Sequence, residues 1–328
     1  MSILSQNKTL YGSDVKIITQ ASNCSVYQFE GETGKGTMTS YAVFPGIELI
    51  YNDFKMGNCF SNKNPYTNIM EINHCSQGRF ECEFHNGSFI YLKEGDLSVN
   101  MLGNHTKNSC FPLEHYVGVS VVIDLEVAKE YTNSLMEDVS IDLFGLRDRI
   151  CFHDKCFIMR TTPSINHIFS ELYTVPDKIK KGYFKLKVLE LLLFLSAIDV
   201  DDQRREPQYF NKCQVDGVKQ IKKYLVAHLD RQFTLAELSN QFDISLTAMK
   251  SCFKGVYGTT IFSFVRGYRM QIAAEMLLEG KESVTVIAGK VGYSNASKFA
   301  AAFKKEMGVP PMQYKKNCLI GAGSIRLE

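Results

Sequence analysis

The sequence contains no apolar run long enough to cross a bilayer. Its most apolar window, Val188–Ile198, is about half as long as the ~20 apolar residues that a membrane helix needs, and it includes Glu190. The first residues show no basic flank followed by an apolar stretch, so the sequence predicts no signal peptide. We therefore expect a soluble, cytoplasmic protein in which this window forms a core or interface helix.

The ten cysteines are scattered, and no two of them form a C-x-x-C pair. Without an export signal, this spacing predicts reduced thiols that serve mostly as small apolar side chains. Cys75 and Cys82 lie seven residues apart, which is not a zinc-type spacing.

Motifs for catalysis and for metal binding are also missing. The sequence has no G-x-S-x-G, no H-E-x-x-H and no phosphate-binding G-x-x-x-x-G-K. The histidines of the N-terminal half are isolated and form no H-x-H pair: His74, His85, His105 and His115. We therefore predict that the protein is not an enzyme and holds no metal and no cofactor.

Charge is distributed unevenly along the 328 residues. Residues 217–316 carry 12 Lys and 3 Arg against 2 Asp and 5 Glu, a net charge of +8, which leaves −6 for the remainder of a chain whose total is +2. A basic module joined to an acidic one suggests a polyanionic partner for the basic module, although a basic face can also be merely solvated. The polar run DDQRREPQ at 201–208, which contains Pro207, is typical of a linker.

The basic module contains one pattern twice, at an offset of 49 residues. Residues 234–245 and 283–294 share apolar positions at the i, i+3, i+7 spacing of a helix face and a small residue, Ser239 or Ala288, near the middle. Each unit then turns, and Ser245 or Ser294 is placed to cap a second helix that stops at a glycine. Thr234 and Glu237 also have the spacing of a capping box, which the second unit lacks.

A short helix, a tight turn and a more basic helix predict a helix-turn-helix in each unit. The alternative is a pair of helical hairpins that only pack together. The small residues favour the first interpretation because they permit close approach of the second helix, which keeps an exposed Lys/Ser/Thr/Asn face. The apolar-periodic segment 261–278 would separate the units so that both second helices reach successive major grooves, about 34 Å apart.

Residues 217–316 resemble the DNA-binding domain of AraC/XylS-type transcription regulators. The resemblance rests on the two spaced units, on Arg269, Ala273 and Met276-Leu277 in the connecting segment, and on VGYSNASKFAAAFKKEMGVPPMQY at 291–314. It implies that the second helix of each unit enters a major groove. The implied DNA-binding residues are Ser245, Thr247, Lys250, Ser251 and Lys254 in the first unit, and Ser294, Asn295, Ser297, Lys298, Ala301, Lys304 and Lys305 in the second.

The second unit departs from the family pattern at Ala300–Ala302, where a long polar residue often stands. Alanine can touch a thymine methyl but cannot donate bidentate hydrogen bonds to guanine. We therefore expect the first unit to contribute more base readout, and the second to bind mainly phosphates through Lys298, Lys304 and Lys305.

The N-terminal region shows a strand pattern. In residues 79–84 apolar side chains alternate with charged ones, Asn86-Gly87 is a strong hairpin signal, and 88–92, 97–101 and 117–123 follow as further strands. The spacing predicts a small barrel or sandwich, which the resemblance implies to be a cupin-like sensor domain. Helices are expected at 163–173 and 178–199; they either cover the barrel or pair two subunits.

The expected fold class is α+β, with an N-terminal cupin-like β-barrel and trailing helices before an all-α C-terminal domain. The expected segments are a sensor at 1–160, a helical pair with a possible dimer surface at 161–200, a linker at 201–216, the DNA-binding domain at 217–316 and a tail at 317–328. Candidate residues for a ligand pocket in the barrel are Met70, Ile72, Phe80, Phe84, Phe89 and Tyr91, although an ordinary packed core is the alternative for each.

The sequence thus predicts a sequence-specific transcription regulator, an activator by preference, that binds double-stranded DNA and responds to a small-molecule or protein effector. RNA polymerase and a second copy of the chain are further expected partners. Two alternatives remain open. One is nucleic-acid binding without sequence readout, and the other is a cupin-fold binder or enzyme whose helical half is an assembly module.

Overall fold

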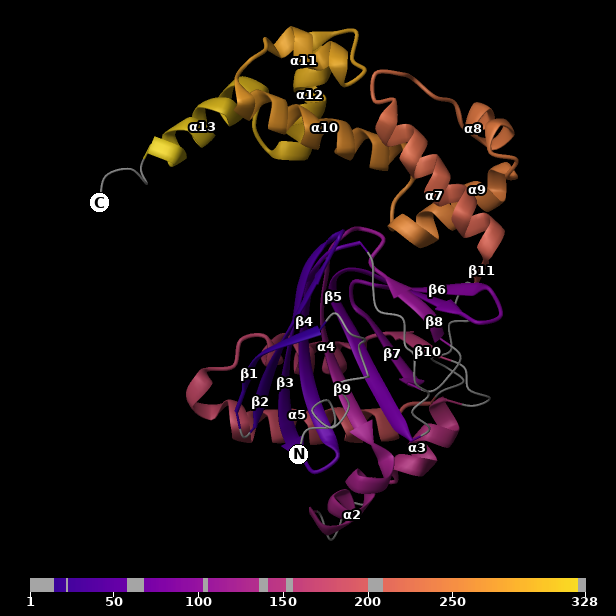
Figure 1. Ribbon diagram of the computed structural model, residues 1–328, viewed down its shortest axis with the longest axis vertical. Helices are drawn as coiled ribbons and strands as arrows, with labels where there is room; N and C mark the ends of the chain where they lie inside the picture. Colours follow the sequence, from indigo (N-terminus) through magenta and orange to yellow (C-terminus); the bar gives the residue numbers. More distant parts are fainter. Residues whose placement is uncertain are drawn as a thin grey trace. The chain divides into compact units, whose positions relative to one another are not determined.

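The computed structural model describes residues 15–21, 23–57, 68–102, 106–135, 141–151, 156–199 and 209–323. By its internal contacts the chain divides into two compact units, Met1–Asn211 (unit 1) and Lys212–Glu328 (unit 2). Unit 1 combines an antiparallel sheet with helices, and unit 2 is helical (Figure 1). The mixed architecture agrees with the expected α+β class, whereas the cupin-like barrel stays a prediction.

The strands of unit 1 are paired antiparallel throughout. In chain order they are β1 (Val15–Gln20), β2 (Cys24–Gly31), β3 (Gly34–Phe44), β4 (Ile47–Lys55), β5 (Ile69–Phe84), β6 (Ser88–Lys93), β7 (Asp96–Met101), β8 (Thr106–Cys110), β9 (Tyr116–Asp124), β10 (Phe157–Arg160) and β11 (Phe210–Asn211). The main path of neighbours is β1-β2-β3-β4-β9-β5-β6-β11, with β7 and β8 also on β5 and β10 on β7.

The 16-residue strand β5 organises this sheet. Its first half pairs with β9 and β7, and its second half pairs with β6 and β8. A register shift between Cys75 and Gln77 separates the halves, and Gly78 follows it with φ of 83°. A β-bulge of this kind bends the strand, so β5 contributes to both parts of the sheet.

The Asn86-Gly87 hairpin joins β5 to β6 as predicted. Its turn closes through the backbone N–H of Gly87, which donates to the carbonyl of Phe84 over 2.9 Å. Gly87 has φ of 76°, whereas Asn86 does not have a positive φ. This is the longer hairpin loop in which a turn is followed by a left-handed glycine, and not the two-residue turn.

The two faces of the central strands differ in character. One face is apolar, with Leu49, Ile72 and Val121 at 0 % exposure in a large core that also includes the helices. The opposite face points into the fold and mixes aromatic residues with buried polar ones such as Asn73 and Ser120. Both faces are therefore buried, which is why strand 117–123 reads as a continuous β-branched run.

Helices cover the apolar face. They are α2 (Leu125–Leu135), α3 (Leu143–Ile150), α4 (Pro163–Leu172), the 3₁₀ turn η2 (Asp177–Ile179) and α5 (Lys180–Ser196). The α4 and α5 bounds agree with the two helices expected at 163–173 and 178–199. Phe169 of α4 stacks on the buried His74 ring with centroids 4.1 Å apart, and Phe184 of α5 packs on Tyr41 at 5.0 Å. Figure 1 shows both helices along one side of the sheet.

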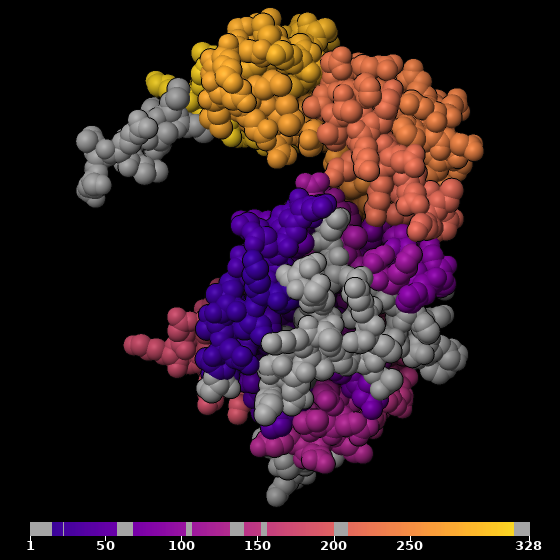
Figure 2. Space-filling model, viewed as in Figure 1, coloured from indigo at the N-terminus to yellow at the C-terminus, as the bar shows by residue number. Residues whose placement is uncertain are grey.

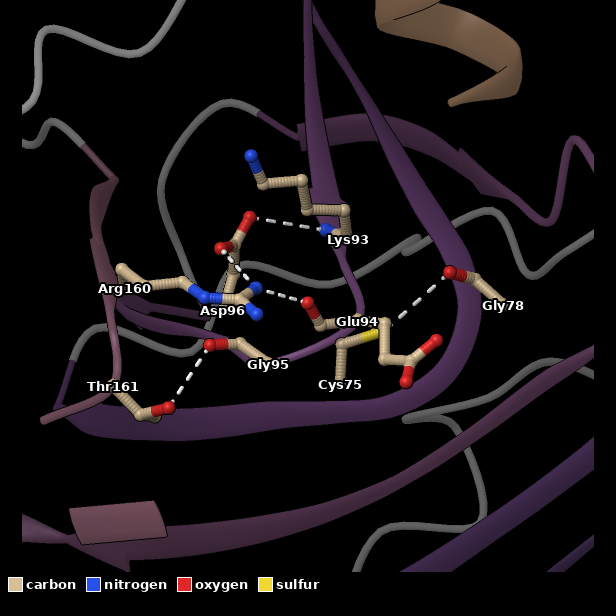
Figure 3. Close-up of polar contacts among 8 residues, drawn as sticks. All are labelled: Cys75, Gly78, Lys93, Glu94, Gly95, Asp96, Arg160 and Thr161. Carbon is tan, nitrogen blue, oxygen red and sulfur yellow. Dashed lines mark hydrogen bonds and ion pairs between the residues drawn. The ribbon is translucent and has the colours of Figure 1, made fainter. Parts of the chain in front are cut away.

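A polar latch fastens β10 to the turn between β6 and β7 (Figure 3). The Arg160 guanidinium donates to the Glu94 carbonyl and lies 3.4 Å from the Asp96 carboxylate. The hydroxyl of Thr161 donates to the Gly95 carbonyl over 3.0 Å. Gly95 has φ of 75°, and a Cβ there would lie 2.7 Å from the Arg160 guanidinium. The turn therefore requires glycine, and the latch holds β10 against β7.

Unit 2 consists of seven helices within the described residues. They are α7 (Lys212–Ala227), α8 (Leu235–Gln241), α9 (Leu246–Tyr257), α10 (Ile261–Glu279), α11 (Val284–Lys290), α12 (Ala296–Met307) and α13 (Pro311–Gly323). Figure 2 shows α7–α9 and α10–α13 as two contiguous lobes. The helix α9 packs against α7, α8 and α10, whereas α12 packs against α10, α11 and α13.

Two segment boundaries differ from the expected ones. The helix α7 begins at Lys212, inside the segment 201–216 expected to be a linker, because the apolar residues Val215 and Val218 already pack in its core. The helix α13 continues to Gly323, inside the expected tail. Residues 201–208 of the linker, 324–328 of the tail and His105 lie outside the described residues.

Candidate nucleic-acid interface

The first helix-turn-helix consists of α8 and α9. Thr234 caps α8 through a reciprocal pair of bonds: its hydroxyl accepts from the Glu237 N–H over 3.1 Å, and its own N–H donates to the Glu237 carboxylate over 2.8 Å. Ser245 caps α9 by accepting from the Ala248 N–H over 3.3 Å. Gly258 ends α9 with φ of 78°. The capping box, the serine cap and the glycine stop are those that the sequence predicts.

The second helix-turn-helix, α11 and α12, has the same backbone hydrogen bond in its turn as the first. The Ile244 N–H donates to the Ser239 carbonyl over 3.1 Å, and 49 residues later the Tyr293 N–H donates to the Ala288 carbonyl over 2.8 Å. Both turns also contain a left-handed residue at matching positions, Asp243 and Gly292. The duplicated sequence pattern therefore corresponds to a duplicated turn.

The cap of α12 is Asn295, whereas the sequence pattern pointed to Ser294. The Asn295 side-chain oxygen accepts from the N–H groups of Ser297 and Lys298, over 2.8 and 3.0 Å. Asparagine and serine are about equally good caps, so the helix register decides between them. Because this oxygen is engaged, only the amide NH₂ group of Asn295 remains to donate to DNA.

Arg269 of α10 connects the two helix-turn-helices of unit 2. Its guanidinium donates to the Arg231 carbonyl, after α7, over 2.5 Å and lies 6.0 Å from the Tyr293 ring centroid. Burial lowers the pKa of this guanidinium. A Cβ on Gly292 would lie 2.5 Å from the Leu229 carbonyl oxygen and 2.7 Å from Arg269. Glycine at 292 therefore lets the second turn pack closely, whereas Asp243 in the first turn has room for a side chain.

The helix α10 connects the two helix-turn-helices. Its 19 residues correspond to about 28 Å at about 1.5 Å per residue. An ion pair between the Arg266 Nε and the Glu306 carboxylate, 2.7 Å apart, fastens α10 to α12. Because Glu306 is paired in this way, its negative charge does not oppose the basic face of α12.

The predicted DNA-binding residues lie mostly at the surface. All are exposed except Ser251, which is half-buried: Ser245, Thr247, Lys250 and Lys254 on or before α9, and Ser294, Asn295, Ser297, Lys298, Ala301, Lys304 and Lys305 on or before α12. Within Ala300–Ala302 only the middle alanine is exposed. The opposite sides of the helices are core residues, with Met249 and Phe253 on α9 and Phe299 and Phe303 on α12 at 0 % exposure.

The six residues predicted to line a ligand pocket in unit 1 do not lie together in the structure. A cavity of about 60 Å³ lies on the inner face, lined by Glu71, Phe80, Cys82, Ile90, Leu92, Ser98, Asn100, Leu102, Ser109, Cys156 and Ile158. Of the six candidates only Phe80 lines it. Met70 and Ile72 belong to the apolar core on the other face, Phe89 and Tyr91 alternate with the lining residues of β6, and Phe84 contacts Tyr209. The lining residues that the sequence did not single out include four polar ones, which are Glu71, Ser98, Asn100 and Ser109.

The described residues include neither a membrane-spanning helix nor a cluster of metal-binding side chains. No helix among them is long and apolar enough to span a membrane. Within the same ranges, no three His, Cys, Asp or Glu side chains gather in a way that could hold a metal ion.

The comparison with known families and proteins points to one class. A family model described as a helix-turn-helix domain matches residues 238–317. A putative AraC-like transcription regulator of Streptomyces lividans is 32% identical over 87 residues, which are 26% of this chain and 29% of that protein. The transcriptional activator RhaR of Mannheimia succiniciproducens is 24% identical over 155 residues, 47% of this chain and 55% of that protein. The chain thus spans less than two thirds of either relative.

Among solved structures, the C-terminal domain of AraT, a response regulator from Geobacillus stearothermophilus, is similar to part of this chain. The sequence identity is 30%, the TM-score is 0.30, and the match covers 31% of this chain and 84% of that one. The family match lies in the C-terminal part of the chain, and the relatives are named as transcription regulators.

The Asn295 cap gives a prediction about stability. Replacing Asn295 with alanine removes the acceptor of two backbone N–H groups and is expected to lower the free energy of unfolding by about 1 kcal/mol. Asn295→Asp keeps an acceptor and places a negative charge at the helix N-terminus, so it is expected to be neutral or slightly stabilising. Urea denaturation followed by circular dichroism measures both. The same substitution at the neighbouring Ser294 is the control, and equal losses at both positions would contradict the assignment of the cap.

Proposed function

We propose that this chain is an AraC-type transcription regulator that binds specific sequences of double-stranded DNA through unit 2. The observation that carries the proposal is the pair of second helices, α9 and α12, each capped and packed on its inner side while its outer side is basic and exposed. Both helices pack on α10, which connects the two helix-turn-helices. The helix-turn-helix family match and the names of the relatives support the same function, and the relative named as an activator favours activation.

We further propose that the two helices have different tasks. The outer side of α9 offers Thr247, Lys250 and Lys254, whose hydroxyl and ammonium groups can hydrogen-bond to base edges. The middle of α12 offers Ala301, which can only make apolar contact, beside Lys298 and Lys304 at either side. Base readout therefore falls mainly to α9, whereas α12 contributes mainly attraction to phosphates.

This division predicts two different effects of alanine substitution. Thr247→Ala with Lys250→Ala should reduce the preference for the cognate duplex over a scrambled one, by about 1–3 kcal/mol per lost base contact. Lys304→Ala with Lys305→Ala should weaken binding to both duplexes equally and reduce the slope of log K against log salt by about 0.9 per phosphate contact. Fluorescence anisotropy with a duplex selected from a random pool measures both quantities.

The control for these variants is Lys178→Ala, which removes an exposed lysine of unit 1 and should leave binding unchanged. If the α9 variant kept its full sequence preference, the assigned division would be wrong. If wild-type protein did not distinguish selected from scrambled duplex at matched salt, the protein would be a nucleic-acid binder without sequence readout.

Unit 1 is the proposed sensor, and α5 the proposed dimer surface. This helix exposes apolar side chains on its outer side, with Leu186 64 % exposed and Phe194 39 % exposed, while Leu189 and Leu193 are only half-buried. A second copy of the chain could bury this stripe, which presents the same patch on both subunits as a two-fold dimer requires. Contact with RNA polymerase is a further proposal that follows from activation.

A charge at the centre of this stripe should prevent dimer formation. Leu186→Glu is expected to shift sedimentation from dimer to monomer without loss of folding, because the side chain already lies mostly in solvent. Lys185→Glu, on the neighbouring position, changes charge without altering the apolar stripe and serves as the control. If the wild-type chain sedimented as a monomer, α5 would only cover the sheet and would not form a dimer surface.

The alternative function, a small-molecule binder or enzyme whose helical half is an assembly module, predicts no DNA binding by unit 2. The anisotropy experiment distinguishes the two, because this alternative requires that no selected duplex be enriched.

A further inference from the structure

The cavity in unit 1 contains a carboxyl group to which the described residues supply no nearby positive charge. Glu71 is on the inner face of β5, and the surface that it retains lies against the cavity. Its hydrogen-bond partners are Ser120 and Asn100. Among the described residues, no cation contributes to the electrostatics of this carboxyl group. A buried carboxylate is normally paired or neutralised.

The partners of Glu71 are not sufficient for a carboxylate. The Ser120 hydroxyl lies 3.2 Å from the Asn73 side-chain oxygen as well, and it accepts from the Asn52 amide over 3.0 Å. A hydroxyl has one proton, so it can donate to only one of Asn73 and Glu71 at a time. When Ser120 donates to Asn73, the Asn100 amide is the remaining described donor to Glu71. A carboxylate with two oxygens can accept about four hydrogen bonds.

Other residues that line the cavity can accept hydrogen bonds from a small bound molecule. Ser98 and Asn100 of β7 supply a hydroxyl and an amide oxygen near Glu71, whereas Phe80, Ile90 and Leu92 form an apolar side. For comparison, an apolar cavity of about 150 Å³ in another protein accommodates benzene, so about 60 Å³ is enough for two or three non-hydrogen atoms. The group that fits is small, cationic at one end and apolar at the other.

We propose that this cavity is a binding site for small primary ammonium ions, with the Glu71 carboxylate as counter-ion and Asn100 and Ser98 as further acceptors. An R–NH₃⁺ group supplies three N–H donors to these oxygens, and its methyl or ethyl group contacts the apolar side. Binding is independent of unit 2. Only the consequence for DNA affinity rests on the proposed function.

The proton of Glu71 gives the site a characteristic pH dependence. Burial raises the pKa of Glu71 to about 7, so below this pH the bound ammonium ion must displace a proton to solvent. Affinity should therefore rise about tenfold between pH 6 and pH 8. The other titratable groups that face Glu71 are Tyr116 of β9 and the thiols of Cys82 and Cys156. Burial raises the pKa of Tyr116 well above its ordinary value and that of Cys156 to about 12.

The test titrates the full chain with methylammonium and ethylammonium chloride at constant ionic strength and follows the thermal unfolding midpoint. A ligand of this size makes few contacts, so Kd is expected on the order of millimolar. Methanol and ethanol are neutral probes of the same shape, acetate is the anionic probe, and potassium chloride tests a simple cation. The midpoint should rise only with the two ammonium salts, and the effect should strengthen from pH 6 to pH 8.

Glu71→Gln is the decisive variant because it keeps the shape of the side chain and removes the buried charge, so it is expected to fold. It should lose the response to ammonium salts and the pH dependence, whereas Glu32→Gln, at an exposed position, should keep both. An equal response to ethanol, acetate or potassium, or a full response in Glu71→Gln, would overturn the proposal. Ammonium binding with unchanged DNA affinity would support the site and contradict its role as the signal for unit 2.

A second observation concerns the boundary between the units. The last residues of unit 1, Phe210 and Asn211, form the two-residue strand β11 opposite Phe89 and Ser88 of β6 (Figure 1). The next residue, Lys212, already begins α7. Phe210 is 5 % exposed, and its ring lies 6.0 Å from that of Tyr91.

We infer that β11 is a releasable tether that sets the freedom of unit 2. The pairing is only two residues long, and short segments near the boundary of a unit open more readily than the central strands of a sheet. The strand that holds β11 also lines the cavity: Ile90 and Leu92 of β6 face the cavity, while Phe89 and Tyr91 alternate with them. A change in the cavity that moves β6 therefore also changes the pairing between β6 and β11.

A disulfide that fixes β11 and a substitution that weakens its contact test this inference in opposite directions. Ser88→Cys with Asn211→Cys places two thiols directly opposite each other and should lock β11 when oxidised. Phe210→Ala should release it. Small-angle X-ray scattering should give a narrower distance distribution for the oxidised protein than for its reduced form, and a broader one for Phe210→Ala. The single variant Ser88→Cys is the control for the native cysteines, and identical curves for all forms would refute a tether.

Discussion

The buried guanidinium of Arg269 is the interaction on which the geometry of unit 2 depends. It donates to the carbonyl of Arg231, which follows α7, and it lies beside Gly292 and Tyr293 in the turn of the second helix-turn-helix. A hydrogen bond to a charged group contributes about 1.5–3 kcal/mol, but its main effect here is on position. Because one side chain of α10 contacts both halves, the two second helices cannot move independently without breaking it.

Unit 1 meets a different constraint, because both faces of its central strands are buried. The face under α4 and α5 is filled by apolar side chains, and it provides most of the hydrophobic stabilisation. The inner face mixes aromatic residues with a hydrogen-bonded polar set, for example the Tyr116 hydroxyl donating to Asn73 over 2.7 Å and the Ser40 hydroxyl donating to Glu48 over 2.6 Å. Stability is thus concentrated on one face, which leaves the other available for a polar cavity.

The sequence predicts unit 2 better than unit 1, for a physical reason. Helix caps such as Thr234, Ser245 and Gly258 are local, so the residues that make them are neighbours in the chain, and α12 shows the limit because Ser294 and Asn295 are equally good caps. In β5, by contrast, residues 69–75 are buried on both sides, so alternation cannot tell which face is inside. The sequence therefore points to apolar residues such as Met70 and Ile72, which lie on the helix-covered face, while Glu71 lines the cavity. The register shift after Cys75, which no short motif marks, further separates the two halves of the strand.

The position of Glu71 is best explained by a site, since it does not help the fold. Its pKa of about 7 in the folded chain exceeds the ordinary value of 4.5, so the folded state binds the proton more tightly than the unfolded state does. Stability therefore falls as pH rises from about 4.5 to about 7, and above pH 7 the loss is on the order of 3 kcal/mol. A glutamine or leucine at this position would avoid that loss. At neutral pH this carboxyl group weakens its own domain, and a cation that joins it in the cavity restores stability.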